Sequence, residues 1–143
     1  MNYSKAQMTD ANALDNLLTK LIQDERTNYD NTIDANFVVK DFYKNYILDE
    51  NKFLYTCKDD DVIVAYIYVY LDNSLAVIDA LYVSDNYRNK GIATKLIEYA
   101  ISWIKSKSCE FIDVSVISAN ISAKKLYEKF GFRTYKEIKR LEI

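Results

Sequence analysis

The sequence contains no histidine and no proline, and only two glycines and two cysteines among its 143 residues. Without histidine, Ser-His-Asp triads, Cys-His dyads and histidine-ligated metal sites are excluded. Two glycines, Gly91 and Gly131, cannot build a dinucleotide-binding GxGxxG loop or a Walker loop. Cys57 and Cys109 form no CxxC pair, so we expect two small hydrophobic residues rather than a metal or redox site.

Long hydrophobic runs are also lacking. The longest, Val62 to Leu71, is half of the roughly 20 residues that a membrane-spanning helix needs. The stretch from Met1 to Gln7 is too polar to serve as a signal peptide. Since 50% of the residues are hydrophobic and 28% are charged, the chain can bury a core and stay in solution. We expect one cytoplasmic domain over residues 1–143, with no membrane contact.

The net charge of −2 is unevenly distributed. Residues 1–83 carry 7 Lys and Arg against 14 Asp and Glu, whereas residues 84–143 carry 12 against 7. A pI near 5.2 argues against a nucleic-acid partner. The basic half could receive a smaller anion, such as a phosphate-bearing cofactor, and the acidic half favours a cationic substrate.

Hydrophobic periodicity predicts a mixed α/β fold, in which an antiparallel meander precedes a parallel, right-handed β-α-β crossover. A first helix should begin at Thr9 or Asp10, and a second should carry Val39, Phe42, Tyr43, Tyr46 and Ile47 at helical spacing. The acidic run Asp59–Asp61 falls where a hairpin must turn, so we expect a solvated turn and no metal site. The other predicted elements are strands at 2–7, 52–58, 62–71, 75–83 and 111–116, helices at 91–106 and about 123–130, and a closing strand from about 132.

The join between the strand at 75–83 and the following helix carries the strongest chemical signal. Two cations, Arg88 and Lys90, precede a first helical turn that presents only Gly91, Ala93 and Thr94. The unpaired N–H groups of a helix N-terminus bind anions, and small residues let a pyrophosphate approach them. From these residues alone, an ordinary turn with solvated cations is equally acceptable.

Two motifs resemble the GNAT superfamily of acyl-CoA-dependent N-acetyltransferases. Arg88-Asn89-Lys90-Gly91-Ile92-Ala93 fits its Q/R-x-x-G-x-G/A signature, and residues 120–132 fit its N-x-x-A-x-x-L-Y-x-x-x-G-F segment. Asp85 and Asn89 depart from the family pattern, since many relatives have proline and glycine there. The resemblance covers residues 75–135, whereas the preceding residues match only in the order of elements.

The resemblance implies that acetyl-CoA is the co-substrate and that no metal is needed. The backbone of Leu81, Tyr82 and Val83 would pair with the pantetheine arm. The pyrophosphate would be held by Arg88, Asn89, Lys90, Gly91, Ile92, Ala93 and Thr94. Asn120 would contact the pantetheine or cap the last helix, and Gly131 would end that helix.

The same resemblance assigns catalysis to Tyr127, whose phenol would protonate the departing CoA thiolate; by spacing alone it is a core residue. Asp79 is the only acid between Leu75 and Val83 and is a candidate general base, or simply a polar residue at a sheet edge. We expect it to share a strand face with Leu81 and Val83, and the N–H of Tyr82 or Val83 to stabilise the oxyanion.

The acceptor would be the primary amine of a small, cationic molecule. Alternatives are a protein N-terminal or lysine acetyltransferase and a non-catalytic acyl-CoA sensor. The closing strand could pair with a second copy in a homodimer.

Overall fold

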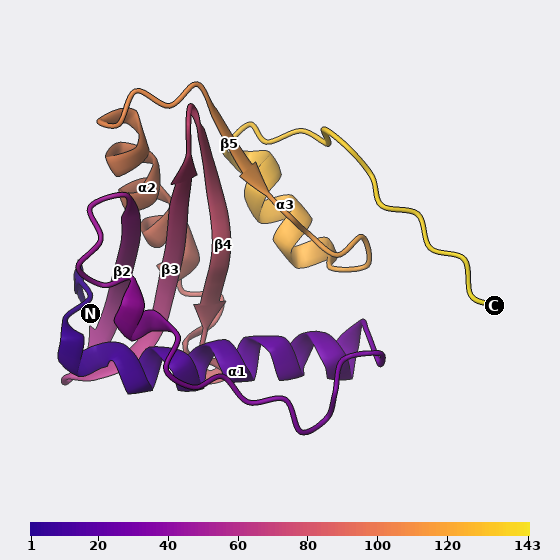
Figure 1. The fold of residues 1–143 in the computed structure, drawn as a ribbon, viewed down its shortest axis with the longest axis horizontal. Coiled ribbons are helices and arrows are strands. Elements are labelled where there is room, and N and C mark those ends of the chain that lie inside the picture. Colours follow the sequence, from indigo (N-terminus) through magenta and orange to yellow (C-terminus); the bar gives the residue numbers. More distant parts are fainter.

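The computed structural model describes all residues from 1 to 143 and contains one five-stranded sheet in the order β1-β2-β3-β4-β5. The strands β1 to β4 pair antiparallel, and β4 pairs with β5 in parallel, as the hydrophobic pattern predicts. Three helices accompany the sheet (Figure 1). The bounds are β1 Asn2–Lys5, α1 Ala11–Asn28, β2 Lys52–Asp59, β3 Val62–Asp72, β4 Leu75–Val83, α2 Ile92–Lys105, β5 Phe111–Val114 and α3 Ile121–Lys129.

The sheet separates two hydrophobic cores. In Figure 1, α1 crosses one face of the sheet near one end of β3 and β4, and α2 packs on the opposite face. The core under α2 includes Val69, Ile78, Leu96 and Tyr127, and the core under α1 includes Leu14, Tyr43, Tyr66 and Tyr68. None of the helices combines the length and apolar composition needed to cross a bilayer.

The hairpin turn between β2 and β3 lies where the sequence predicts it. Asp60 and Asp61 both have positive φ, which is the backbone of a two-residue hairpin loop between β2 and β3. The Tyr87 hydroxyl donates a 2.6 Å hydrogen bond to Asp59, which ties this turn to the segment after β4. The prediction of a turn at 59–61 is therefore confirmed, and no cluster in the chain has the ligands to hold a metal ion.

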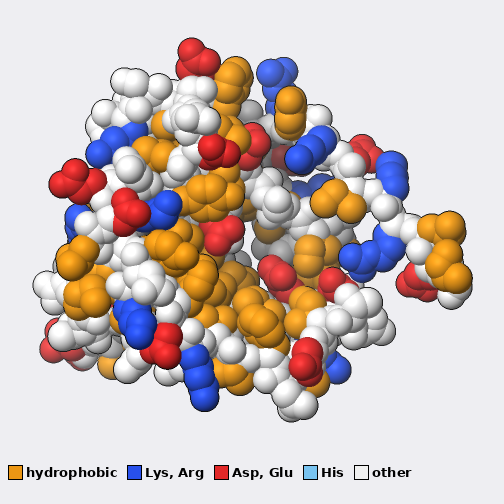
Figure 2. Space-filling model, viewed as in Figure 1, with side chains coloured by type: hydrophobic (Ala, Val, Ile, Leu, Met, Phe, Trp, Pro, Cys, Tyr) orange, Lys and Arg blue, Asp and Glu red, His pale blue; other side chains and the backbone are white.

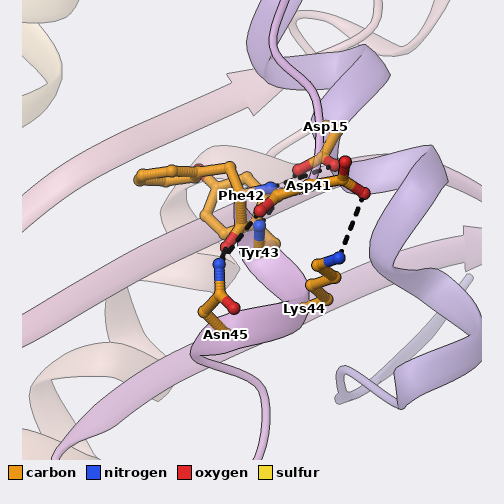
Figure 3. A network of polar contacts seen from close by, with 6 residues as sticks. All are labelled: Asp15, Asp41, Phe42, Tyr43, Lys44 and Asn45. Atoms are coloured by element: carbon orange, nitrogen blue, oxygen red, sulfur yellow. Dashed lines mark hydrogen bonds and ion pairs between the residues drawn. The ribbon is translucent and has the colours of Figure 1, made fainter.

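The helix predicted around residues 39–47 is wrong. Asp41 has φ +52, which interrupts a right-handed helix, and only Tyr43–Asn45 form a short 3-10 turn. Figure 3 shows how this turn is held: the buried carboxylate of Asp15 on α1 accepts the backbone N–H of Tyr43 at 3.1 Å and of Phe42 at 3.4 Å. The apolar residues at helical spacing still pack inward, but from a turn that α1 holds in place.

The closing strand predicted from about residue 132 is also wrong. Residues 132–143 pair with no strand and run away from the body of the molecule as an extended tail (Figure 1). Tyr135, Ile138 and Leu141 are each more than 80% exposed. Their spacing of three cannot place them on one face of a strand, where side chains alternate every two residues. The tail contacts the segment after α1 through an ion pair of 3.6 Å between Arg140 and Asp30.

Candidate active site

β4 extends beyond the end of its parallel partner β5, and this leaves a gap beside the last residues of β4. The pairing of β4 with β5 ends at Ile78 opposite Val114, but β4 continues to Val83. The strand predicted over 111–116 is two residues shorter than expected, because the chain leaves the sheet after Val114 and turns toward α3. The edge of β4 from Asp79 to Val83 therefore has no neighbouring strand on the β5 side.

Backbone groups of two residues face this open edge. The Ser84 N–H donates to the Val64 carbonyl of β3 at 2.8 Å, so by alternation Tyr82 also faces β3, and Leu81 and Val83 face the gap. The Val83 carbonyl accepts a 2.8 Å hydrogen bond from Arg88 Nε. The N–H and carbonyl of Leu81 and the N–H of Val83 remain available, so Val83 is the better placed of the two oxyanion donors expected from the sequence.

Asp79 is the extra residue of a β-bulge in β4. Tyr68 of β3 lies opposite Ala80, and the next residue, Val69, lies opposite Ile78, which leaves Asp79 without a partner. The bulge shifts the alternation: Ile78 and Leu81 pack toward α2, whereas Ala80 packs toward α1.

The expected shared face of Asp79 with Leu81 and Val83 is therefore wrong. Asp79 instead lies near the tyrosines of the core under α1. Burial raises the pKa of both Tyr66 and Tyr68, and the Asp79 charge raises both further. Desolvation in turn raises the pKa of Asp79 itself above the ordinary aspartate value. A carboxylate with a raised pKa is a stronger proton acceptor than an ordinary aspartate.

The N-terminus of α2 has the geometry of an anion site. Gly91 is the N-cap residue with φ +80, and no side chain caps the helix. The first helical hydrogen bond runs from the Lys95 N–H to the Gly91 carbonyl, so the N–H groups of Ile92, Ala93 and Thr94 have no partner in the helix. A Cβ on Gly91 would meet nothing within 4 Å, which shows that the backbone borders open space.

The two cations of this loop have different surroundings. Arg88 is held by Asp24 of α1 at 3.3 Å and by Asp85 at 3.1 Å, in addition to its bond to the Val83 carbonyl. Its guanidinium therefore ties the loop to α1 and β4. Lys90 forms no ion pair, and its ammonium lies 5.6 Å from the centre of the Tyr87 ring. Of the two expected side-chain contacts to a pyrophosphate, Lys90 has the free charge.

Tyr127 lies in the core under α2 with its hydroxyl unused. Its ring packs edge-on against Phe132 at 5.4 Å. The hydroxyl forms no hydrogen bond within the protein, and no fully buried polar side-chain atom lacks a partner, so this hydroxyl reaches the surface. Burial raises the pKa of Tyr127 to about 12, which keeps the phenol protonated at neutral pH.

Both ends of α3 are fixed by residues that the motif contains. Asn120 Oδ1 accepts the Ala123 N–H at 3.1 Å, which confirms the capping role. Gly131 has φ +92 and donates to the Glu128 carbonyl, while Phe132 donates to the Tyr127 carbonyl at 3.2 Å. This pair of bonds is a Schellman motif, so the helix-ending role of Gly131 is confirmed.

Sequence reasoning missed three contributors to the site. Asp15 and Asp24 act across long sequence separations, and no local pattern marks them. The third is a group of tyrosines on the α1 face of the sheet, Tyr66, Tyr68 and Tyr70. Their strict alternation along β3 is the signal that could have identified them as one surface.

The open edge of β4 precedes the uncapped N-terminus of α2 in the chain, and Tyr127 lies in the core under α2. A family model described as "Acetyltransferase (GNAT) family" matches residues 16–132. The chain therefore belongs to the GNAT acetyltransferase family. The resemblance found in the two motifs is confirmed.

Individual relatives share part of the sequence or the fold. A streptothricin acetyltransferase of Escherichia coli is 40% identical over 60 residues, which cover 42% of this chain and 34% of that protein. A GNAT-family acetyltransferase from Staphylococcus aureus superposes with a TM-score of 0.74 at 24% identity, over 94% of this chain and 85% of that one. An aminoglycoside N-acetyltransferase in complex with CoA has a TM-score of 0.73 at 14% identity, over 99% and 98%. The two structures establish a shared fold, and the matched stretch spans about a third of the curated relative.

Proposed function

We propose that the protein transfers an acetyl group from acetyl-CoA to a primary amine of a small, cationic acceptor by direct attack. The observation that carries the proposal is one apolar cluster that contains Tyr127 and Ile92, with Leu81 and Val83 packed against it. The open edge of β4, the free amides of α2 and the unused phenol would then border the same gap.

The chain would bind two parts of acetyl-CoA, the pantetheine arm and the pyrophosphate. The free backbone groups of Leu81 and Val83 would hold the pantetheine arm as an added strand, with Tyr82 fixing the strand between them. The amides from Asn89 to Thr94 and the Lys90 ammonium would hold the pyrophosphate. Arg88 would fix the shape of this loop, and the unused side-chain nitrogen of Asn120 is free to contact the pantetheine.

Three groups would carry the reaction. Bound acetyl-CoA supplies a thioester whose carbonyl carbon is attacked by the amine nitrogen, with cleavage of the carbon–sulfur bond. The Val83 N–H would stabilise the charge on the thioester oxygen. Asp79 would accept the proton that the amine loses, and Tyr127 would donate its proton to the departing sulfur.

The acceptor is proposed to be cationic because the first 83 residues, which include α1 and the strands β1 to β4, hold twice as many acids as bases. An acidic surface raises the local concentration of cations and their association rate. The kcat/KM of a cationic amine should then fall with ionic strength more steeply than that of a matched neutral amine. Parallel loss for the two amines would contradict electrostatic selection of the acceptor.

Thiol release from acetyl-CoA, measured across a panel of primary amines, tests the proposed reaction. Amine-dependent release of CoA supports acetyl transfer. Binding of CoA without release by any amine, whether small molecule, peptide N-terminus or lysine side chain, would instead favour an acyl-CoA sensor. Failure to bind CoA at all would overturn the assignment of the site.

The assembly and location of the protein form part of the proposal. The free edge of β5, where Phe111 is 65% exposed, and the unpaired tail fit a homodimer in which strand edges of two copies meet. Sedimentation of the full chain and of a chain ending at residue 132 tests this, and identical monomeric values would contradict it. Two unpaired cysteines fit the reducing cytoplasm.

A further inference from the structure

One part of the α1 face of the sheet is left uncovered by α1 and carries a group of aromatic side chains. Figure 2 shows hydrophobic side chains gathered over the middle of this view, with charged ones set among them. Tyr68 is central in this group: its ring stacks on Tyr46 at 5.8 Å and lies 6.3 Å from Tyr70. Tyr46 and Tyr70 are only partly buried, so their rings remain accessible from solvent.

An ammonium group already occupies this aromatic surface. Lys52 Nζ lies 5.8 Å from the centre of the Tyr46 ring and 5.8 Å from that of Tyr70. Lys52 forms no ion pair, so the rings, and not a carboxylate, hold its charge. A cation within about 6 Å of an aromatic face is attracted by the ring quadrupole. The two tyrosines therefore form a cation site that the protein fills with its own side chain.

The sheet register places this cation site at a defined distance from Asp79. Lys52 on β2 lies opposite Tyr70 on β3, which lies opposite Val77 on β4, two positions before Asp79. Adjacent strands are about 4.8 Å apart, so about 10 Å separates Lys52 from the strand of Asp79. Tyr68 bridges the interval, since it contacts both rings of the cation site and lies within the field of the Asp79 charge.

We propose that Tyr46 and Tyr70 form a second cation subsite of the acceptor surface, and that Lys52 occupies it until a diamine displaces it. The inference rests on the proposed acetyl transfer. An acceptor with two ammonium groups would place one at Asp79, where it is deprotonated and acetylated, and the other between the two rings. Lys52 thus determines specificity, because its positive charge competes with the second ammonium group and leaves a monoamine unaffected.

Hexanediamine and hexylamine are suitable probes, because they differ in one ammonium group. Replacing Lys52→Met empties the subsite, so the KM for hexanediamine should fall about two- to fivefold, the range of an exposed cation–π interaction. The KM for hexylamine and the kcat for both amines should stay unchanged. Lys52→Arg should behave as the wild type, and Tyr70→Leu in the Lys52→Met background should abolish the gain.

Lys107→Met is the matched control. Lys107, which follows the end of α2, also lies over an aromatic ring, 5.5 Å from the centre of the Trp103 ring on that helix. It should change neither KM. The CoA-induced rise in melting temperature verifies that each variant is folded and binds its co-substrate.

Two different failures can be told apart. If neither amine releases CoA from the wild type, the proposed function is wrong for these acceptors. Calorimetric binding of the two amines to wild type and Lys52→Met then still tests the subsite. If Lys52→Met changes the KM or the binding affinity equally for hexanediamine and hexylamine, the second cation subsite is refuted while acetyl transfer stands.

Discussion

Replacing Tyr127 by phenylalanine removes a single oxygen atom from the proposed site. The ring is 7% exposed and packs against Phe132, and the substitution keeps this contact. Because the hydroxyl forms no hydrogen bond within the protein, no partner is left unsatisfied, and the free energy of unfolding should change little. Loss of a general acid typically lowers the rate about 10²–10⁴-fold, which corresponds to about 2.7–5.5 kcal/mol of transition-state stabilisation.

The assay is thiol release at saturating acetyl-CoA and amine, with CoA affinity measured separately by thermal shift. The kcat of Tyr127→Phe should fall by at least a hundredfold while CoA affinity stays within a factor of two or so. Tyr135→Phe, at an 85% exposed position in the tail, is the control for removal of a tyrosine hydroxyl. Since the pKa of Tyr127 is about 12, the wild-type kcat should show no alkaline decline up to about pH 10. If Tyr127→Phe has the wild-type kcat, Tyr127 is not the general acid and serves only to pack the core.

Four further predictions follow from the described contacts. CoA at 100 times its dissociation constant should stabilise the fold by about 2.7 kcal/mol without magnesium, and an unshifted melt would contradict the site. Gly91→Ala forces a side chain into φ +80, so we expect a loss of about 1–2 kcal/mol in stability and weaker CoA binding, both by thermal melt; unchanged affinity would argue against the loop. The kcat of the wild type should decrease as the pH is lowered through the raised pKa of Asp79, because the protonated carboxyl accepts no proton. Asp79→Asn should remove this decrease at acidic pH. Asp15→Ala leaves the amides of Phe42 and Tyr43 unpaired and should cost about 1–3 kcal/mol in urea unfolding, whereas an unaltered midpoint would mean that the turn folds without it.

The elements predicted correctly are those whose pattern is local. β4 has the predicted bounds, Leu75 and Val83, and α2 begins and ends within one residue of the predicted helix at 91–106. Strand alternation and helical periodicity act over a few residues, so both elements could be predicted. The uncapped turn before α2 was predictable for the same reason, since Gly91 and its small neighbours are adjacent in the chain. Gly131 likewise ends its helix through local bonds, its own to Glu128 three positions before it and that of Phe132 to Tyr127 five positions before Phe132.

The errors occur where a distant residue decides the local structure. Helical spacing between Val39 and Ile47 is real, but Asp41 has a left-handed backbone, and Asp15, 28 residues before Tyr43, binds the amide of Tyr43. Arg88 has the right residue type for a phosphate contact, yet Asp24, 64 residues away, binds its guanidinium. The face of Asp79 was mispredicted because a bulge offsets alternation by one residue, and no single-strand pattern reveals where it falls.

The bulge at Asp79 adds one residue to β4 without changing which residues pair on either side of it. Tyr68 lies opposite Ala80 and Val69 lies opposite Ile78, so a strand without Asp79 would pair the same residues in unbroken alternation. Ile78 and Leu81 would keep their places in the core under α2, and Ala80 would stay in the core under α1. The two cores therefore do not depend on this residue, and its carboxylate can be changed without repacking either of them.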